Sequence, residues 1–186
     1  VGRALPGVCV VAMDVDTRQI LPPDHEGLLV VRSPARMQGY LDRDDLTQKA
    51  FVHDGYDTGD VGRVDADGFI TITGRLARFA KVGGEMVPLD KVEADLAAAL
   101  RARHPDAEFV LAVAAVRDES RGERLVVLHT GLPCTATDLA ALAEGLPPLF
   151  RPRARDVHQV EALPSLGSGK RDLKALREMA ERIAAG

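Results

Sequence analysis

The pattern of apolar residues changes near Gly74, and this change limits the possible folds more than any other feature of the chain. Before it, short apolar runs such as residues 8–12 and 28–31 are bounded by proline, glycine and acidic residues, as is typical of strands and turns. After it, segments with helical spacing alternate with strand-like runs. We therefore predict an α+β fold with two units: a small antiparallel β-subdomain at residues 1–74, then a compact α/β domain at residues 75–186 with a short central sheet flanked by helices.

Several elements can be placed within these units. Residues 61–73 predict a β-hairpin, because Asp65-Ala66-Asp67-Gly68 supplies a turn whose glycine can take a positive φ. Apolar residues recur with helical spacing from Leu89 to Leu100, and basic residues follow where they complement the helix dipole. The other predicted elements are strands at residues 109–116, 125–130 and 156–160 and helices at residues 137–144 and 172–184.

Composition narrows the class of protein. The 186 residues are 46% apolar with a net charge of −4, which suits real cores and argues against a surface that binds nucleic acid throughout. No apolar run approaches the ~20 residues that span a bilayer, and no secretory pattern opens the chain. We predict that Cys9 and Cys134 are reduced, as in a cytosolic protein. Because the chain opens at Val1 rather than methionine, we expect it to be a fragment of a longer protein.

The first candidate site is the motif Tyr56-Asp57-Thr58-Gly59-Asp60. An ionised carboxylate such as that of Asp60 only accepts hydrogen bonds, and it can take two from the vicinal hydroxyls of a ribose. Thr58 and Gly59 ahead of it would let the backbone turn tightly next to a ligand. The alternative is a turn or capping carboxylate, and the motif alone leaves both open.

The second candidate lies at the predicted boundary between the units, within residues 74–87. A guanidinium at the position of Arg75 can contact a ribose or a phosphate, and the backbone beside it can serve as a pivot. In the alternative, Arg75, Arg78 and Lys81 form a solvated basic strand face. The position at the boundary favours the functional interpretation.

Two glycine-containing segments complete the candidate site. Gly83 and Gly84 can form a hairpin turn, which their spacing favours, or can line a channel too narrow for side chains. Lys170 ends the segment Leu166-Gly167-Ser168-Gly169-Lys170, in a loop before the last predicted helix. A mobile loop can deliver an ammonium to a centre where negative charge develops. The alternative, an exposed lysine near a helix start, is disfavoured because a cation there opposes the helix dipole. No metal-ligand spacing and no Ser-His-Asp or Cys-His arrangement occurs.

These motifs, in this order, resemble those of the adenylate-forming superfamily, which includes acyl-CoA synthetases, luciferases and peptide-synthetase adenylation domains. The resemblance covers nearly the whole chain. It implies that residues 1–74 end a large N-terminal adenylation domain and that residues 75–186 form a C-terminal lid that rotates. It also implies that ATP and Mg²⁺ are used. The nucleotide-binding residues that it implies are Tyr56, Thr58, Asp60 and Arg75.

The same resemblance gives roles to the glycine-containing segments. It implies that Lys170 is the catalytic residue of adenylation, and that Gly83 and Gly84 line the pantetheine channel of the second half-reaction. The phosphate loop, adenine pocket and acyl tunnel of the superfamily have no counterpart in these residues. We therefore expect this chain alone to be inactive.

Within the superfamily, residues 75–87 and 164–170 look most like the acyl-[acyl-carrier-protein] synthetase half of the bifunctional 2-acylglycerophosphoethanolamine acyltransferases. That resemblance implies a fatty acid substrate, activated to acyl-AMP and passed to the phosphopantetheine thiol of acyl carrier protein. It implies a cytoplasmic protein, with any association with the inner membrane made through other parts of a longer chain. One alternative is an acyl-CoA synthetase that uses CoA. Another is a non-catalytic module that docks an acidic carrier protein through Arg75, Arg78, Lys81, Arg151, Arg153 and Arg155.

Overall fold

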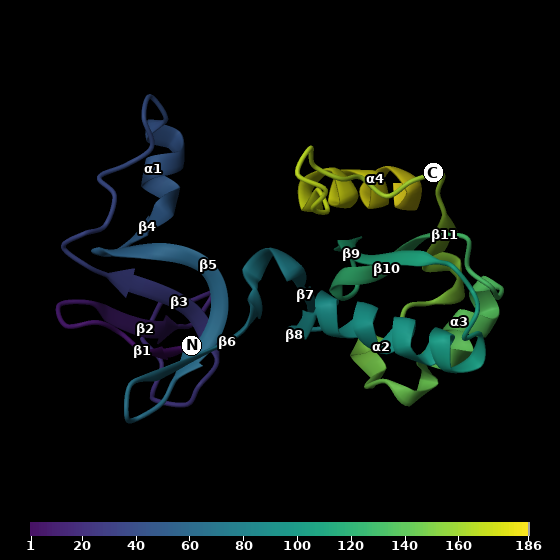
Figure 1. The fold of residues 1–186 in the computed structure, drawn as a ribbon, viewed down its shortest axis with the longest axis horizontal. Helices are drawn as coiled ribbons and strands as arrows, with labels where there is room; N and C mark the ends of the chain where they lie inside the picture. The colour runs from purple at the N-terminus through teal and green to yellow at the C-terminus, as the bar shows by residue number, and fades with distance from the viewer. Residues whose placement is uncertain (186) are drawn as a thin grey trace. The chain divides into compact units, whose positions relative to one another are not determined.

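The computed structural model describes residues 1–185 and divides the chain into two compact units, Val1–Ala77 and Arg78–Gly186 (Figure 1). We call them unit 1 and unit 2 and describe each by itself. A short 3₁₀ helix, η1 at Leu76–Arg78, spans the division. The apolar pattern placed the boundary after residue 74, and the division falls after residue 77. One antiparallel sheet and a second sheet with helices confirm the predicted α+β class.

Unit 1 is an antiparallel sheet with one short helix. Its strands are β1 Gly2–Arg3, β2 Cys9–Met13, β3 Gly27–Arg32, β4 Phe51–Val52, β5 Gly55–Val64 and β6 Phe69–Arg75, and its helix is α1 Asp44–Ala50. The strand order is β1-β6-β5-β3-β2, with β4 paired to β5. Met13, Leu28 and Val30 form a small buried cluster on β2 and β3. The long strand β5 thus lies inside the sheet, with β3 and β6 as neighbours.

Helix α1 corrects the prediction that residues 8–73 contain only strands and turns. None of its residues is buried, and no side chain caps its N-terminus. Asp44 and Asp45 in its first turn complement the helix dipole. The Thr47 hydroxyl accepts a hydrogen bond from the Tyr40 amide (2.9 Å), which ties the helix to the preceding loop.

The β5–β6 hairpin confirms the predicted turn at residues 65–68. The Asp65 carboxylate accepts hydrogen bonds from two backbone amides of the turn (3.0 and 2.8 Å), and Gly68 takes a φ of +81°. The pairing of the strands shifts register next to Gly62. A Cβ at Gly62 would lie 2.3 Å from the carbonyl oxygen of Thr71, so only glycine allows the two backbones to approach this closely.

Unit 2 is a mixed five-stranded sheet with helices on both faces (Figure 1). Its strands are β7 Phe79–Val82, β8 Glu85–Pro88, β9 Val110–Asp118, β10 Gly122–Thr130 and β11 Val157–Gln159, and its helices are α2 Leu89–Arg103, α3 Ala136–Leu142 and α4 Leu173–Ala185. Short 3₁₀ turns are η2 Ala143–Gly145, η3 Pro148–Phe150 and η4 Ala154–Asp156. Strand β11 runs parallel to β10, and the other pairs are antiparallel.

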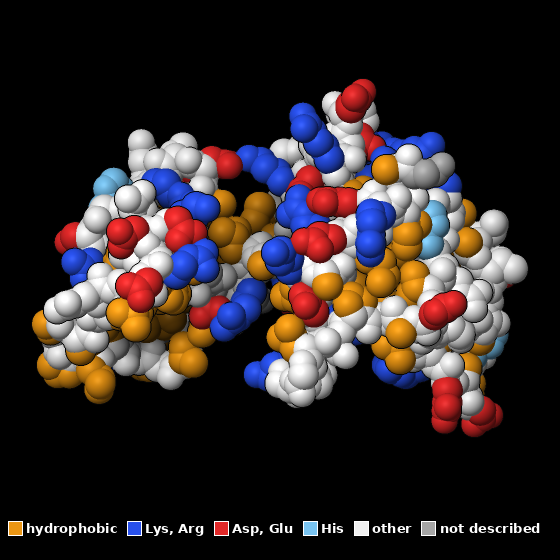
Figure 2. Space-filling view, turned by 90° about the horizontal axis from the view of Figure 1, so that it is seen from above, with side chains coloured by type: hydrophobic (Ala, Val, Ile, Leu, Met, Phe, Trp, Pro, Cys, Tyr) orange, Lys and Arg blue, Asp and Glu red, His pale blue; other side chains and the backbone are white. Residues whose placement is uncertain are grey.

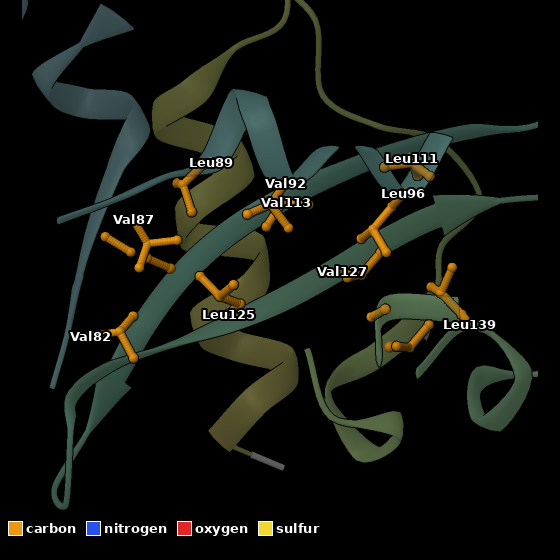
Figure 3. Close-up of a cluster of buried hydrophobic side chains, with 14 of the residues drawn as sticks. Val82, Val87, Leu89, Val92, Leu96, Leu111, Val113, Leu125, Val127 and Leu139 are labelled. Carbon is orange, nitrogen blue, oxygen red and sulfur yellow. The ribbon is translucent and has the colours of Figure 1, made fainter. Parts of the chain in front are cut away.

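The two longest strands of unit 2 are buried on both faces because their side chains alternate between two cores. One core lies under α2 and α3, as Figure 3 shows, and it receives Leu111, Val113, Ala115, Leu125 and Val127. The other core lies under α4 and receives Ala112, Ala114, Val116, Val126 and Leu128. The sheet therefore holds helices on both sides and forms a rigid frame for the loops of unit 2.

The helices and strands predicted for unit 2 are confirmed with small shifts at their ends. The predicted helix at residues 137–144 is α3 followed by η2, and the last predicted helix is α4. Within residues 1–185, no helix is both long and apolar enough to cross a membrane.

Candidate functional site

The motif at residues 56–60 lies within β5, and its own side chains shape its backbone. The Thr58 hydroxyl donates to a carbonyl of β3 (2.8 Å) and accepts from the amide of Asp60 (3.0 Å). Gly59 takes a φ of +70°, and its amide donates to the carboxylate of Asp57 (2.8 Å). The hydroxyl of Thr58 is therefore engaged in the fold, and it sets the backbone from which Asp60 projects.

Asp60 and Arg75 lie opposite each other on β5 and β6. The Nε atom of Arg75 is 3.2 Å from Oδ1 of Asp60, and the side chains are 70% and 21% exposed respectively. The two residues belong to separate sequence motifs, and the fold of unit 1 brings them together. A carboxylate acceptor beside a guanidinium donor suits a ribose next to a phosphate.

Tyr56 is held by other aromatic residues of unit 1. A side-chain hydrogen bond with Tyr40, together with burial, raises the pKa of Tyr56. The ring of Tyr56 also meets the ring of Phe51 edge-on, with centroids 6.0 Å apart. The phenol therefore stays protonated at neutral pH, which leaves it a role in hydrogen bonding or stacking rather than as a base.

Gly83 and Gly84 form the two-residue turn between β7 and β8, the alternative that their spacing favoured. Their φ values are +61° and +90°, which side-chain-bearing residues rarely adopt. The amide of Gly83 donates to the carbonyl oxygen of Arg121 (2.8 Å). Beside this hairpin lies a small hollow rich in arginine, lined by Val82, Arg121, Arg124, Leu125, Leu149, Arg151, Arg153 and Asp156.

Lys170 lies at the end of a short closed loop before α4. The amide of Leu166 donates to the carbonyl oxygen of Lys170 (2.7 Å), and the amide of Gly169 donates to that of Leu166 (2.8 Å). Ser165 and Arg171 close the loop as an antiparallel bridge. The Lys170 side chain is exposed and makes no hydrogen bond or ion pair in the part of the chain that the structure describes. Its ammonium is available to an incoming anion.

A carboxylate, that of Asp172, lies at the start of α4, two residues after Lys170. The carboxylate of Asp172 accepts hydrogen bonds from the amides of Lys174 and Ala175 (3.1 and 3.0 Å). The negative charge of Asp172 therefore lies at the N-terminal, positive end of the α4 dipole. The dipole of α4 by itself does not disfavour an exposed lysine at position 170. The catalytic role predicted for Lys170 is therefore supported by the geometry of its loop and not by the helix dipole.

Arg78 is buried, which corrects its predicted place on a solvated or docking basic face. Its side chain is 6% exposed. Its guanidinium donates to Asp90 (2.6 Å), to Glu93 (2.9 Å) and to the carbonyl oxygen of Val113 (2.9 Å). Two acidic residues three apart on α2, and so on one helix face, are the sequence signal that could have indicated this partner. A carrier-docking surface therefore cannot include Arg78.

The residues described fit a nucleotide better than they fit a metal ion. Within residues 1–185, no three His, Cys, Asp or Glu side chains gather closely enough to hold a metal. Asp60 and Arg75 match the hydroxyls and phosphates of ATP by donor and acceptor type. Cys9 and Cys134 are free thiols, as predicted.

The chain matches no protein-family model, but known proteins resemble it over almost its entire length. It is 35% identical over 182 residues to 4-coumarate–CoA ligase-like 9 of Oryza sativa subsp. japonica, a match that covers 96% of this chain and 32% of the relative. It is 33% identical over 173 residues to 2,3-dihydroxybenzoate-AMP ligase of Bacillus subtilis, covering 88% of this chain and 30% of the relative.

Solved structures agree with these relatives. The amide bond synthetase McbA from Marinactinospora thermotolerans is 33% identical with a TM-score of 0.69, over 96% of this chain and 35% of that one. ATP-bound MatB from Rhodopseudomonas palustris is 27% identical with a TM-score of 0.74, over 98% and 36%. Over nearly its whole length, the chain is thus similar to the C-terminal portion of acyl-CoA-ligase-like and peptide-synthetase enzymes of the adenylate-forming superfamily. It spans about a third of the length of the ligases that it matches.

Proposed function

We propose that this chain ends the adenylation domain and forms the C-terminal lid of an ATP-dependent acid–thiol ligase. The observation that carries the proposal is the exposed ammonium of Lys170 on a closed loop, in a chain that corresponds to the C-terminal portion of adenylate-forming enzymes. The pairing of Asp60 with Arg75 supports it, since both predicted nucleotide contacts lie on one surface of unit 1.

In the proposed first half-reaction, a carboxylate oxygen of the acid attacks the α-phosphorus of ATP. A phosphorus–oxygen bond forms to give acyl-AMP as the bond to pyrophosphate breaks. Negative charge gathers around the α-phosphate, where the ammonium of Lys170 would stabilise it. Asp60 would accept hydrogen bonds from the ribose. An exposed ion pair contributes at most about 1 kcal/mol, so a nucleotide can draw Arg75 away from Asp60 at little cost.

In the proposed second half-reaction, a thiol sulfur attacks the carbonyl carbon of acyl-AMP. A thioester forms, AMP leaves with the bonding electron pair, and the thiol proton passes to solvent or a nearby base. The Gly83–Gly84 turn would line the path of the pantetheine arm, because its two residues place no side chain there.

The lysine assignment is tested in the full-length protein that carries this chain. Lys170→Ala should lower acid-dependent pyrophosphate release by about 10²-fold or more, as expected when a positioned charge that stabilises the transition state is removed. Lys174→Ala is the matched control, because Lys174 lies nearby on α4 and its side chain is 89% exposed. Normal pyrophosphate release by Lys170→Ala would refute the assignment.

The finer proposal is a fatty acid as the acid and the phosphopantetheine thiol of acyl carrier protein as the acceptor. Figure 2 shows acidic and basic side chains intermixed on the face in view, so attraction of an acidic carrier has to come from a local cluster rather than from the net charge of −4. The arginine-rich hollow beside the Gly83–Gly84 turn is such a cluster. CoA carries phosphates too, and it is the alternative acceptor.

The acceptor is identified by comparing thioester formation on phosphopantetheinylated acyl carrier protein with that on CoA. Reversing the charges of the exposed Arg151 and the half-buried Arg153 to glutamate should raise KM for the carrier by about tenfold at low salt. The effect should be smaller at high salt, because charges in contact with solvent are screened. Arg101→Glu with Arg103→Glu, at the end of α2, is the matched control. Efficient use of CoA alone would assign the chain to an acyl-CoA synthetase. Carrier binding without acyl-AMP formation would favour the non-catalytic module.

A further inference from the structure

Glu93 on α2 joins two arginines that are far apart in the sequence. Its Oε2 atom accepts hydrogen bonds from Arg78 (2.9 Å) and from the amide of Val113 (3.0 Å). Its Oε1 atom accepts from Arg171, the residue directly after Lys170. The side chains of Glu93 and Arg171 are 20% and 27% exposed, so these charge-assisted bonds are partly shielded from water.

Both guanidiniums also bind the backbone of the same strand. Arg78 donates to the carbonyl oxygen of Val113 (2.9 Å), and Arg171 donates to that of Leu111 (3.2 Å), both on β9. The side chains of Leu111 and Val113 belong to the core under α2 and α3. The loop that carries Lys170 is thus attached to helix α2 and to a buried strand of unit 2.

Arg171 is the main polar attachment of that loop. Among residues 164–171, it provides the side-chain hydrogen bonds to the rest of unit 2. The other bonds that hold the loop are backbone bonds, including those that close it from Leu166 to Lys170 and the bridge from Ser165 to Arg171. The position of the Lys170 backbone is therefore set by the contacts of the next residue, Arg171.

We infer that Arg171 and Glu93 are positioning residues for Lys170, which fix the loop so that its ammonium is presented in one direction. This inference rests on the proposed function of Lys170. A displacement of about 1 Å at a reacting centre can cost about 10²-fold in rate, so loss of the attachment should slow adenylation well before it unfolds the unit. The thiol-transfer half-reaction, which we assign to the Gly83–Gly84 turn, should be unaffected.

The test compares Arg171→Met, Arg171→Lys and the control Arg177→Met in the full-length protein. Arg177 is also a charged residue with carboxylate partners, but it lies on α4 away from the loop and is 58% exposed. We expect Arg171→Met to lower kcat for pyrophosphate release by about tenfold or more, with thioester formation from added acyl-AMP unchanged. Arg171→Lys should recover part of the rate because it keeps the charge beside Glu93. Arg177→Met should match the wild type in both half-reactions.

Two further measurements separate this inference from the proposed function. Hydrogen exchange of the Leu166 and Gly169 amides should quicken in Arg171→Met and not in Arg177→Met, whatever the activity. In a Lys170→Ala background, Arg171→Met should have no further effect on adenylation. Equal loss of both half-reactions, or unchanged exchange, would overturn the positioning role. A normal rate in Lys170→Ala would instead overturn the proposed function, and the exchange result would still stand.

Discussion

Among single residues, Arg78 is the clearest case of a buried charge with several partners. Its side chain is 6% exposed, and it binds Glu93 and the carbonyl oxygen of Val113. In Arg78→Met, Glu93 keeps Arg171 as a partner, but the carbonyl oxygen of Val113 loses a buried donor. We therefore expect Arg78→Met to lower the free energy of unfolding by about 2 kcal/mol. Chemical denaturation of the chain, followed by circular dichroism, measures this loss.

Lys91→Met is the control for that variant. Lys91 lies on the same helix, is 60% exposed, and pairs with Asp95 four residues further on (3.0 Å). An exposed pair with this spacing contributes about 0.5 kcal/mol or less, so the denaturation midpoint should barely move. If the two variants lost equal stability, the burial of Arg78 would contribute nothing.

At the residue scale, contacts within one turn could be predicted from the sequence, and contacts between distant segments could not. The turn at residues 65–68 was predictable because the Asp65 carboxylate bonds to amides within the same turn. The burial of Arg78 was not predictable, because its partners belong to α2 and β9 and come close to it only when these elements pack together. The meeting of Asp60 with Arg75 depends on a register shift between β5 and β6, which no local pattern specifies.

At the scale of elements, substitutions of Gly83 in the β7–β8 hairpin can distinguish two roles of this residue. One is to form the turn, and the other is its proposed role in lining the pantetheine channel. A Cβ at Gly83 would lie 3.8 Å from Leu149, an ordinary contact, so the constraint there is the φ of +61°. Asparagine tolerates this conformation, and valine does not. We expect Gly83→Asn to keep the stability of the wild type, and Gly83→Val to lose about 1–2 kcal/mol in thermal unfolding.

The same asparagine variant tests function. If Gly83 lines the pantetheine path, its new side chain should slow thioester formation from added acyl-AMP while pyrophosphate release stays normal. Thioester formation at the wild-type rate would show that the two glycines serve the turn alone.

Helices whose apolar residues recur with a clear period could be predicted from the sequence. Helix α1 has no such period, and it could not be predicted. Helix α2 buries Leu89, Val92, Leu96 and Leu100, the apolar stripe that revealed it. Helix α1 buries nothing and carries no side-chain cap, so it left no signal in the pattern. Its residues are ordered by the neighbouring loop, through the Thr47 hydroxyl, rather than by a core.

At the scale of the whole molecule, the pattern of apolar residues changes near Gly74 because the chain forms two units whose cores differ in size. The fully buried apolar residues of unit 1 are Ala12, Met13, Leu28, Leu29, Val30 and Val61. Unit 2 fills two cores, one on each face of its sheet. Because a small unit buries a smaller share of its surface, unit 1 should be the less stable of the two.

We therefore expect this chain to unfold on heating in two transitions, with unit 1 melting first. Gly62→Ala should move only the lower one, since its Cβ would meet the carbonyl oxygen of Thr71 at 2.3 Å. A loss of about 2 kcal/mol would lower that midpoint by roughly 10 °C in a unit of this size. Arg78→Met should move only the upper transition. A single transition shifted by both variants would mean that the two units unfold together. Calorimetry of the wild type, Gly62→Ala and Arg78→Met decides between these outcomes.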